Sequence, residues 1–153
     1  MRRNARPRTQ FEDKIGREYP FSGEKLSPVL AVFKYSGFET ALKMVAQMLE
    51  VGGKGHSCGI YSFDKDHIQQ LALMAPVSRI MVRQPQVRGN AGSFDNGMPM
   101  TASLGCGTWS GNITSENISV KHYMNVTWVS EKIPEDRPTE QEMFGDFFNS
   151  ETF

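Results

Sequence analysis

Cysteine is scarce in this chain. Only Cys58 and Cys106 occur among 153 residues, and 48 positions separate them. That separation suits neither a disulfide framework nor the closely spaced ligand pairs of a zinc site. We therefore expect no metal, and a reducing, cytoplasmic environment is the default interpretation.

An excess of one charge is also missing, because 17 basic residues balance 17 acidic ones. A neutral chain has no general electrostatic attraction for nucleic acid or for an anionic membrane surface. No apolar segment approaches the roughly 18 residues of a membrane helix, and no apolar core of a secretory signal follows the basic start. The sequence predicts neither nucleic acid nor a membrane as a partner.

The two ends differ in composition from the centre. Residues 1–10 contain four arginines and no acid, and we expect residues 1–17 to be disordered. An organelle-targeting peptide is the alternative for this segment, although no amphipathic period is visible. Residues 131–153 hold seven acids against two basic residues, and we interpret 134–153 as an acidic tail. The length suffices for one domain with a core of its own.

Three short apolar runs predict buried strands at residues 27–35, 57–63 and 78–84. Each is rich in β-branched, aromatic or long aliphatic residues. Helical spacing of apolar residues separates the first run from the second and the second from the third. Strand–helix–strand–helix–strand at this spacing predicts an α/β fold, a βαβαβ unit with a mainly parallel sheet and right-handed crossovers.

Local signals mark the two helices. In the first, which extends from Phe38 past Leu49 to a pair of glycines, Ser36 and Glu39 have the spacing of a capping box. Asp64 is expected to cap the second helix, which must stop before the proline at position 76.

The sequence after the third strand begins with a loop rich in Gly, Asn and Pro at residues 85–102. Ser110 or Asn112 is placed to cap a further helix, with Glu116 in its first turn. Residues 122–130 alternate two distinct faces and predict another strand.

Three side chains are candidates for chemistry on the residues alone. Glu24 precedes a strand opened by proline, where its carboxylate offers acceptors to two adjacent hydroxyls of a sugar; a solvated glutamate is the alternative. His56 follows three glycines within four residues, so it is either an acid or base beside a closely approaching ligand or an exposed residue of a turn. Cys106 lies between glycines, and packing is favoured over nucleophilic attack because no His or carboxylate is near it in sequence.

Five segments resemble, in the same order, the last third of the aldehyde dehydrogenase superfamily, and most closely its CoA-acylating branch. They are PFSGEKLSPVLAVFKY, GGKGHS, SRIMV, SFDNGMPMTASLGCGTWSGNITSEN and KHYMNVT. EKLSPV is similar to the superfamily signature Glu-x-Phe-Gly-Pro-Val, with Leu26 in place of the aromatic residue. The motif beginning SLGCGTW is typical of the acylating branch, and FDNG resembles enzymes of small anionic aldehydes, sulfoacetaldehyde and succinate semialdehyde. The resemblance covers about residues 18–133.

The resemblance implies roles for individual residues. Glu24 matches a glutamate that contacts the nicotinamide ribose and is counted with the active site of acylating members. His56 matches a histidine near the catalytic thiol, whereas Cys106 matches a cysteine that is not the nucleophile. Arg83 and Arg88 flank the loop that leads back to the active site, and we expect one of them to hold the anionic end of the substrate. Solvated arginines, or contacts to coenzyme A phosphates, are the alternatives.

The family uses a cysteine thiolate, NAD or NADP, and coenzyme A to convert an aldehyde into an acyl-CoA. Its nucleophile and dinucleotide-binding domain belong upstream of the position matching Glu24, and this sequence has no counterpart of them. We therefore expect a truncated or partial enzyme that is inactive alone and binds no cofactor tightly. In this interpretation 18–120 is a partial catalytic domain and 121–133 an oligomerisation strand of a homo-oligomer. The alternative is a small assembly module that complements a separately encoded nucleotide-binding half.

Overall fold

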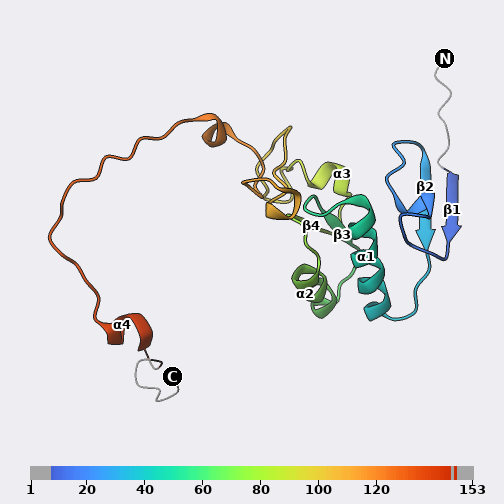
Figure 1. Cartoon of the computed structure of the whole chain (residues 1–153), viewed down its shortest axis with the longest axis horizontal. Helices are drawn as coiled ribbons and strands as arrows, with labels where there is room; N and C mark the ends of the chain where they lie inside the picture. Colours follow the sequence, from blue (N-terminus) through green and yellow to red (C-terminus); the bar gives the residue numbers. More distant parts are fainter. Residues whose placement is uncertain (1–7, 146, 148–153) are drawn as a thin grey trace. The chain divides into compact units, whose positions relative to one another are not determined.

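The computed structural model describes residues 8–145 and 147, which divide between two compact units, Met1–Tyr123 and Met124–Phe153. The larger unit contains, in chain order, β1 (Arg8–Glu12), β2 (Val29–Phe33), α1 (Phe38–Gly52), β3 (Cys58–Ile60), α2 (Lys65–Met74), β4 (Ile80–Val82) and α3 (Gln86–Gly89) (Figure 1). Three 3-10 turns, at Pro20–Ser22, Thr108–Ser110 and Val120–Tyr123, complete it. The predicted order of strands and helices between residues 27 and 84 is confirmed.

The strands form two parallel pairs, not one sheet. β3 pairs with β4 in the register Cys58↔Ile80, and α2 makes the crossover between them, as predicted for a βαβ unit. β2 pairs instead with β1, from Arg8↔Val29 to Glu12↔Phe33. The α/β class with parallel pairing is confirmed, whereas the continuous βαβαβ sheet is not formed.

The strand β1 also corrects the expectation that residues 1–17 are disordered. Composition alone disfavours order in a basic segment with few apolar residues. An exposed strand edge, however, offers unpaired backbone N–H and C=O groups, and Arg8–Glu12 satisfies those of β2. Residues 1–7 lie outside the described residues.

The two helices begin differently. The N-cap of α1 is Gly37, whose φ is 79°, and no side chain caps this end. The predicted capping box of Ser36 and Glu39 is therefore wrong, because Ser36 lies one residue outside the cap position. The prediction for α2 is confirmed: the Asp64 carboxylate accepts hydrogen bonds from the backbone N–H groups of Asp66 and His67 at 2.9 and 3.3 Å.

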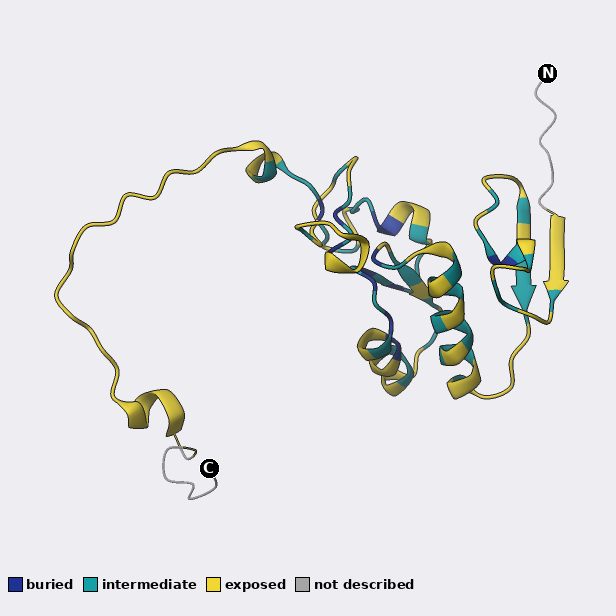
Figure 2. Ribbon diagram, in the orientation of Figure 1, coloured by how far each residue is buried: buried dark blue, intermediate teal, exposed yellow. Residues whose placement is uncertain are grey.

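The core of the larger unit is small. Leu71, Ala75 and Val77 form its buried cluster, and partly buried side chains of α1, β3 and β4 pack against it. Every residue of α1 retains some exposure, and Figure 2 shows dark blue, for buried residues, in only a few short stretches. The amphipathic helix thus has an apolar face that is only partly covered.

The predicted helix after Trp109 does not form. The 3-10 turn Thr108–Ser110 ends at Gly111, which is left-handed with a φ of 71°. The side chain of Asn112 is used elsewhere, since its Oδ1 accepts a hydrogen bond from the backbone N–H of Cys106 at 2.9 Å. The segment turns back on itself instead and makes an antiparallel bridge between Leu104 and Asn117.

The described part of the smaller unit contains the helix α4 (Glu140–Phe144), with a capping box of Thr139 and Glu142. The acidic tail predicted at residues 134–153 therefore contains a short helix that its composition did not predict. Residues 124–139 form neither helix nor strand. The strand predicted at 122–130 is therefore absent from the single chain, because a strand requires a hydrogen-bonded neighbour; its pairing with another subunit remains a prediction. Within the described residues, no helix has the length and apolar character needed to cross a lipid bilayer.

Candidate active-site cleft

The glycine-rich turn between α1 and β3 places His56. Gly55 bridges to Val77, and the backbone carbonyl of Gly55 accepts a hydrogen bond from the N–H of Ser78 at 2.9 Å. Its φ is 99°, and a Cβ at this position would overlap the carbonyl oxygen of Cys106 and the Oγ of Ser110. Only glycine fits there. The turn is thus pressed against the loop that carries Cys106, while the next residue, His56, is exposed.

Glu24 and His56 line one cleft of about 560 Å³. Glu24 is exposed, in the segment between the 3-10 turn Pro20–Ser22 and β2. The other walls come from the C-terminal end of α1, from α3 and its neighbours, and from the loop before Cys106: Met48, Leu49, Gly52, Gly53, Ser57, Gln86, Val87, Asn90, Ala91 and Leu104. Glu24 and His56 are 32 positions apart in sequence, and the resemblance assigns both to one active site. The structure places them in the lining of one cavity.

The chemistry of the cleft suits a sugar with adjacent hydroxyl groups. The exposed carboxylate of Glu24 provides acceptors for two O–H donors. Gly52 and Gly53 contribute backbone without side chains, and the space where their Cβ atoms would lie is open. A nicotinamide ribose carries two adjacent hydroxyls of this kind, and Glu24 is the carboxylate of the cleft lining that would hold it. Among the described residues, no group of three or more His, Cys, Asp or Glu side chains is placed to bind a metal ion.

Ser57 connects His56 to the wall of the cleft. Its Oγ lies 2.8 Å from Nδ1 of His56 and accepts hydrogen bonds from Nε2 of Gln86 at 3.1 Å and Nδ2 of Asn90 at 2.8 Å. Asn90 is only 5% exposed. The imidazole is exposed, but it is tied through one hydroxyl to a buried amide and to α3.

A buried arginine, Arg79, holds the loop that forms part of the cleft wall. Arg79 is 4% exposed, and no carboxylate of the described residues pairs with it. Its guanidinium donates instead to Asn117 Oδ1 at 2.8 Å, to the Gly105 carbonyl at 2.9 Å and to the Ser115 carbonyl at 3.2 Å. Burial lowers the pKa of Arg79 from its ordinary value.

Asn117 continues this network to the cleft. Its Nδ2 donates to the backbone carbonyl of Asn90 at 3.1 Å and to that of Pro99 at 2.7 Å. Arg79, Asn117, Asn90, Ser57 and His56 are therefore linked in series: Asn117 holds the backbone of Asn90, and the side chain of Asn90 holds Ser57. The glycine-rich loop of residues 103–117 is a folded support for the cleft, held by Arg79.

The two cysteines lie outside the cleft. Cys106 is half-buried, and its Sγ lies 4.0 Å from the Leu104 carbonyl. Cys58 lines an adjoining apolar hollow, which shares Met48, Leu49, Ser57 and Gln86 with the cleft, and burial raises the pKa of its thiol. Neither thiol is among the residues that line the cavity of Glu24 and His56.

The two arginines expected to hold the substrate are also absent from the lining of this cavity. Arg83 has a positive φ of 52°, donates to the Ser62 carbonyl at 2.7 Å and stacks over the Phe63 ring at 4.8 Å. Arg88 is exposed on α3, beside the lining residue Val87. Their role in substrate binding remains a prediction.

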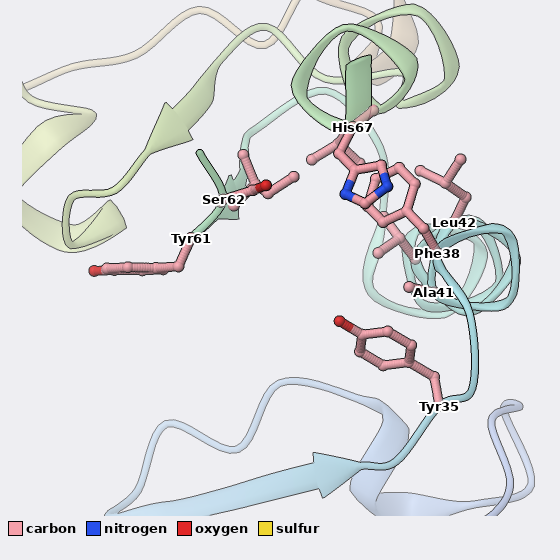
Figure 3. A pocket seen from close by; sticks show the side chains of 11 residues that line it. Tyr35, Phe38, Ala41, Leu42, Tyr61, Ser62 and His67 are labelled. Carbon is pink, nitrogen blue, oxygen red and sulfur yellow. The ribbon is translucent and has the colours of Figure 1, made fainter. Parts of the chain in front are cut away.

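A further hollow, of about 460 Å³, lies between α1, β3 and α2 (Figure 3). Phe38 and His67 stack in it with ring centroids 3.9 Å apart, and Tyr35, Ala41, Leu42 and Tyr61 contribute to the lining. Figure 3 shows Tyr35 and Tyr61 standing apart from each other around this space. The hollow exposes one part of the apolar face of α1, and the hollow lined by Cys58 exposes another.

Sequence reasoning missed the network that supports His56. Ser57, Gln86 and Asn90 carry no motif of their own, and their hydrogen bonds span 29 and 33 positions. One signal was available: Arg79 comes directly before the apolar residues of the motif SRIMV. A cation that enters a buried strand is itself removed from water and must find hydrogen-bond acceptors, which points to a polar loop packed against it.

Comparison with known proteins identifies relatives across most of the chain. The chain is 54% identical over 127 residues to a sulfoacetaldehyde dehydrogenase from an Acholeplasma species, which covers 83% of this chain and 26% of that protein. It is 42% identical over 137 residues to the acylating sulfoacetaldehyde dehydrogenase of Cupriavidus necator, covering 90% of this chain and 28% of the relative. No protein-family model matches.

Solved structures similar to this chain are also aldehyde dehydrogenases. An acetylating aldehyde dehydrogenase from Geobacillus thermoglucosidasius is 37% identical and superposes with a TM-score of 0.72 over 84% of this chain and 29% of that one. A probable aldehyde dehydrogenase from Listeria monocytogenes is 32% identical with a TM-score of 0.77, over 83% and 28%. This chain thus spans little more than a quarter of the length of each of these relatives, and over that part it is homologous to them and shares their fold.

Proposed function

We propose that this chain, as a homologue of the acylating aldehyde dehydrogenases, forms the part of such an enzyme in which Glu24 and His56 face the reacting aldehyde. The reaction is the NAD- or NADP-dependent oxidation of a small aldehyde to its acyl-CoA. One observation carries the proposal: these two residues, far apart in sequence, line one cleft.

The two side chains have different tasks in the proposed enzyme. Glu24 accepts hydrogen bonds from the two ribose hydroxyls and so orients the nicotinamide ring. His56 contributes to the lining of the cleft, and its imidazole Nδ1 lies within hydrogen-bond distance of Ser57 Oγ. The nicotinamide and coenzyme A, when bound, supply the hydride acceptor and the acyl acceptor.

The proposed substrate is a small anionic aldehyde, and sulfoacetaldehyde is our first choice. The support is the sequence similarity, because several relatives bear the name sulfoacetaldehyde dehydrogenase. A guanidinium suits a sulfonate or carboxylate, because its planar donor fork matches two acceptor oxygens. Arg83 and Arg88 are the proposed donors; neither is among the residues that line the cleft of Glu24 and His56.

An exchange of segments tests the proposal. Residues 18–133 of this chain would replace the matching segment of the Cupriavidus necator enzyme, and coenzyme A-dependent nicotinamide reduction would be measured with sulfoacetaldehyde. We expect activity, and a loss of about a hundredfold or more with His56→Ala, the usual range for a group acting on the reacting atoms. Glu24→Gln should lower activity, whereas Glu39→Gln, an equal charge change on α1 away from the cleft, should not. An assembled but inactive chimera would contradict the proposal.

A second candidate function is assembly with a separately encoded nucleotide-binding half. The observation in its favour is the amount of apolar surface: Trp128 is 91% exposed and Tyr123 79%. The hollow of Figure 3 adds an uncovered apolar face on α1. Purification of a tagged chain from its own host, followed by identification of a stoichiometric partner with a dinucleotide-binding fold, would support this function. A chain recovered alone or only with copies of itself would exclude it.

A further inference from the structure

The hydrogen bonds around Ser57 determine which nitrogen of His56 carries the proton. A serine hydroxyl has one donor and two acceptor lone pairs. The amide nitrogens of Gln86 and Asn90 both donate to Ser57 Oγ and thereby use its two lone pairs. The hydroxyl proton is then left for the third neighbour, Nδ1 of His56 at 2.8 Å.

We propose that Ser57 is a positioning residue that fixes neutral His56 as its Nε2–H tautomer. A neutral imidazole has one protonated nitrogen, and the hydrogen bond made by one nitrogen selects the state of the other. Because Nδ1 accepts from Ser57, Nε2 bears the hydrogen. Nε2 has no hydrogen-bond partner among residues 8–145 and 147, and the ring belongs to the lining of the cleft.

The consequence concerns the chemistry of the cleft and rests on the proposed function. In this tautomer His56 offers a hydrogen-bond donor, not a base, through Nε2. The ligand group that it suits is an acceptor that gains negative charge, such as the carbonyl oxygen of an aldehyde or thioester under attack by a thiolate. A neutral donor stabilises that oxygen without a change in its own protonation.

Buried residues hold the side chain that donates to Ser57 in place. Asn90 is buried, and its backbone carbonyl accepts from Asn117, which Arg79 orients in turn. The side-chain amide of Asn90 therefore donates to Ser57 while the backbone of the same residue is held by Asn117. The Oδ1 of Asn90 is buried without a hydrogen-bond partner in the described residues.

Nitrogen NMR of the full chain tests the tautomer without any assay of activity. Long-range proton–nitrogen spectra at about pH 8, above the usual histidine pKa of about 6.5, distinguish the protonated ring nitrogen from the bare one. The loss of signals in His56→Gln assigns the ring among the three histidines. We expect Nε2 protonated and Nδ1 bare. His122 is an internal reference, since its Nδ1 accepts from the Ser119 N–H at 2.9 Å.

Gln86→Glu provides the sharpest variant. The introduced carboxylate cannot donate, so Ser57 would turn its O–H toward the carboxylate and free a lone pair for His56. We expect the proton to move to Nδ1, which inverts the pattern of the two ring nitrogens. Gln70→Glu introduces the same charge on α2, outside the cleft lining, and should leave the pattern unchanged.

Ser57→Ala is the second variant and tests the same point if Gln86→Glu fails to fold. Without the hydroxyl, the two tautomers should interconvert and both ring-nitrogen signals should move toward an average; Ser78→Ala, which removes a hydroxyl without a partner, should leave them in place. A proton on Nδ1 in the unmodified chain would overturn the proposal and show the Asn90 amide turned round. No response to either variant would also overturn it. The chimera assay decides the proposed function separately, because the tautomer is read from this chain alone.

Discussion

Nε of Arg79 donates a hydrogen bond to Oδ1 of Asn117 over 2.8 Å, between two side chains that are 38 positions apart and nearly inaccessible to solvent. The pair joins the residue that precedes β4 to the end of the glycine-rich loop. Because Asn117 also donates to the carbonyl of Asn90, the relationship connects the loop to the wall of the cleft.

Arg79→Leu should therefore destabilise the fold strongly. It would leave the carbonyls of Gly105 and Ser115 and the Oδ1 of Asn117 without their donor. Each unpaired buried acceptor costs about 1–3 kcal/mol, so we expect a loss of about 3–5 kcal/mol in the free energy of unfolding. Urea denaturation followed by tryptophan fluorescence would measure it. Arg17→Leu, at an exposed arginine, is the control, and equal midpoints for the two variants would contradict this assignment.

Substrate binding by Arg83 can be tested with a substitution that suits its backbone conformation. Its φ of 52° is left-handed, which asparagine adopts more readily than most residues. In the chimera we expect Arg83→Asn or Arg88→Met to lower kcat/KM for sulfoacetaldehyde about tenfold or more. This loss corresponds to roughly 1.5–3 kcal/mol, the contribution of a hydrogen bond to a charged group. The kcat/KM for acetaldehyde should not change.

The comparison of the two aldehydes separates the alternatives for these arginines. Equal losses on both substrates would point to coenzyme A or to folding.

Arg83→Val is the strain control, and we expect it to cost about 1–3 kcal/mol of stability more than Arg83→Asn, because a β-branched residue is strained at this φ.

The chain by itself should show no aldehyde-dependent nicotinamide reduction, with or without coenzyme A. The reason is that neither thiol lines the cleft of Glu24 and His56. The measurement is absorbance of reduced nicotinamide with sulfoacetaldehyde as substrate. Turnover that disappears in Cys106→Ala but persists in Cys58→Ala would refute this expectation and identify Cys106 as a nucleophile.

Association of chains should depend on the apolar segment that follows Tyr123. Trp128 and Val129 are 91% and 86% exposed, and an unpaired extended segment with such side chains favours pairing with another chain. Light scattering at micromolar concentration should show oligomers or precipitate. Trp128→Ser should shift the distribution toward the monomer, whereas Phe94→Ser, a comparable loss at an exposed loop position, should not. A monodisperse monomer of the unmodified chain would count against the prediction.

Cys58 should make stability fall at alkaline pH. Burial raises the pKa of its thiol in the folded chain, so the unfolded chain releases this proton first. The free energy of unfolding therefore decreases as pH rises through the ordinary thiol range near about 8.5. Urea denaturation of the unmodified chain and of Cys58→Ala, compared between about pH 7 and 9.5, would isolate the effect. The same slope in both proteins would exclude Cys58 as its source.

The sequence by itself determined the features that depend on near neighbours. Apolar spacing from Phe38 to Leu49 predicted α1, and the carboxylate of Asp64, three residues from His67, predicted the cap of α2. Periodicity and capping act within about four positions, so they are visible in one stretch of sequence. The linear order of GGKGHS, SRIMV and SLGCGTW was equally visible, and it carried the resemblance that the comparisons confirm.

Tertiary structure decided the rest, because the deciding contacts join distant positions. β1 exists because the edge of β2 was free to pair with Arg8–Glu12, and Asn112 caps the Cys106 amide instead of a helix. The state of His56 follows from amides 29 and 33 positions beyond Ser57. A hydroxyl adopts its donor direction only after the fold has brought all of its partners together, and no local pattern contains that information.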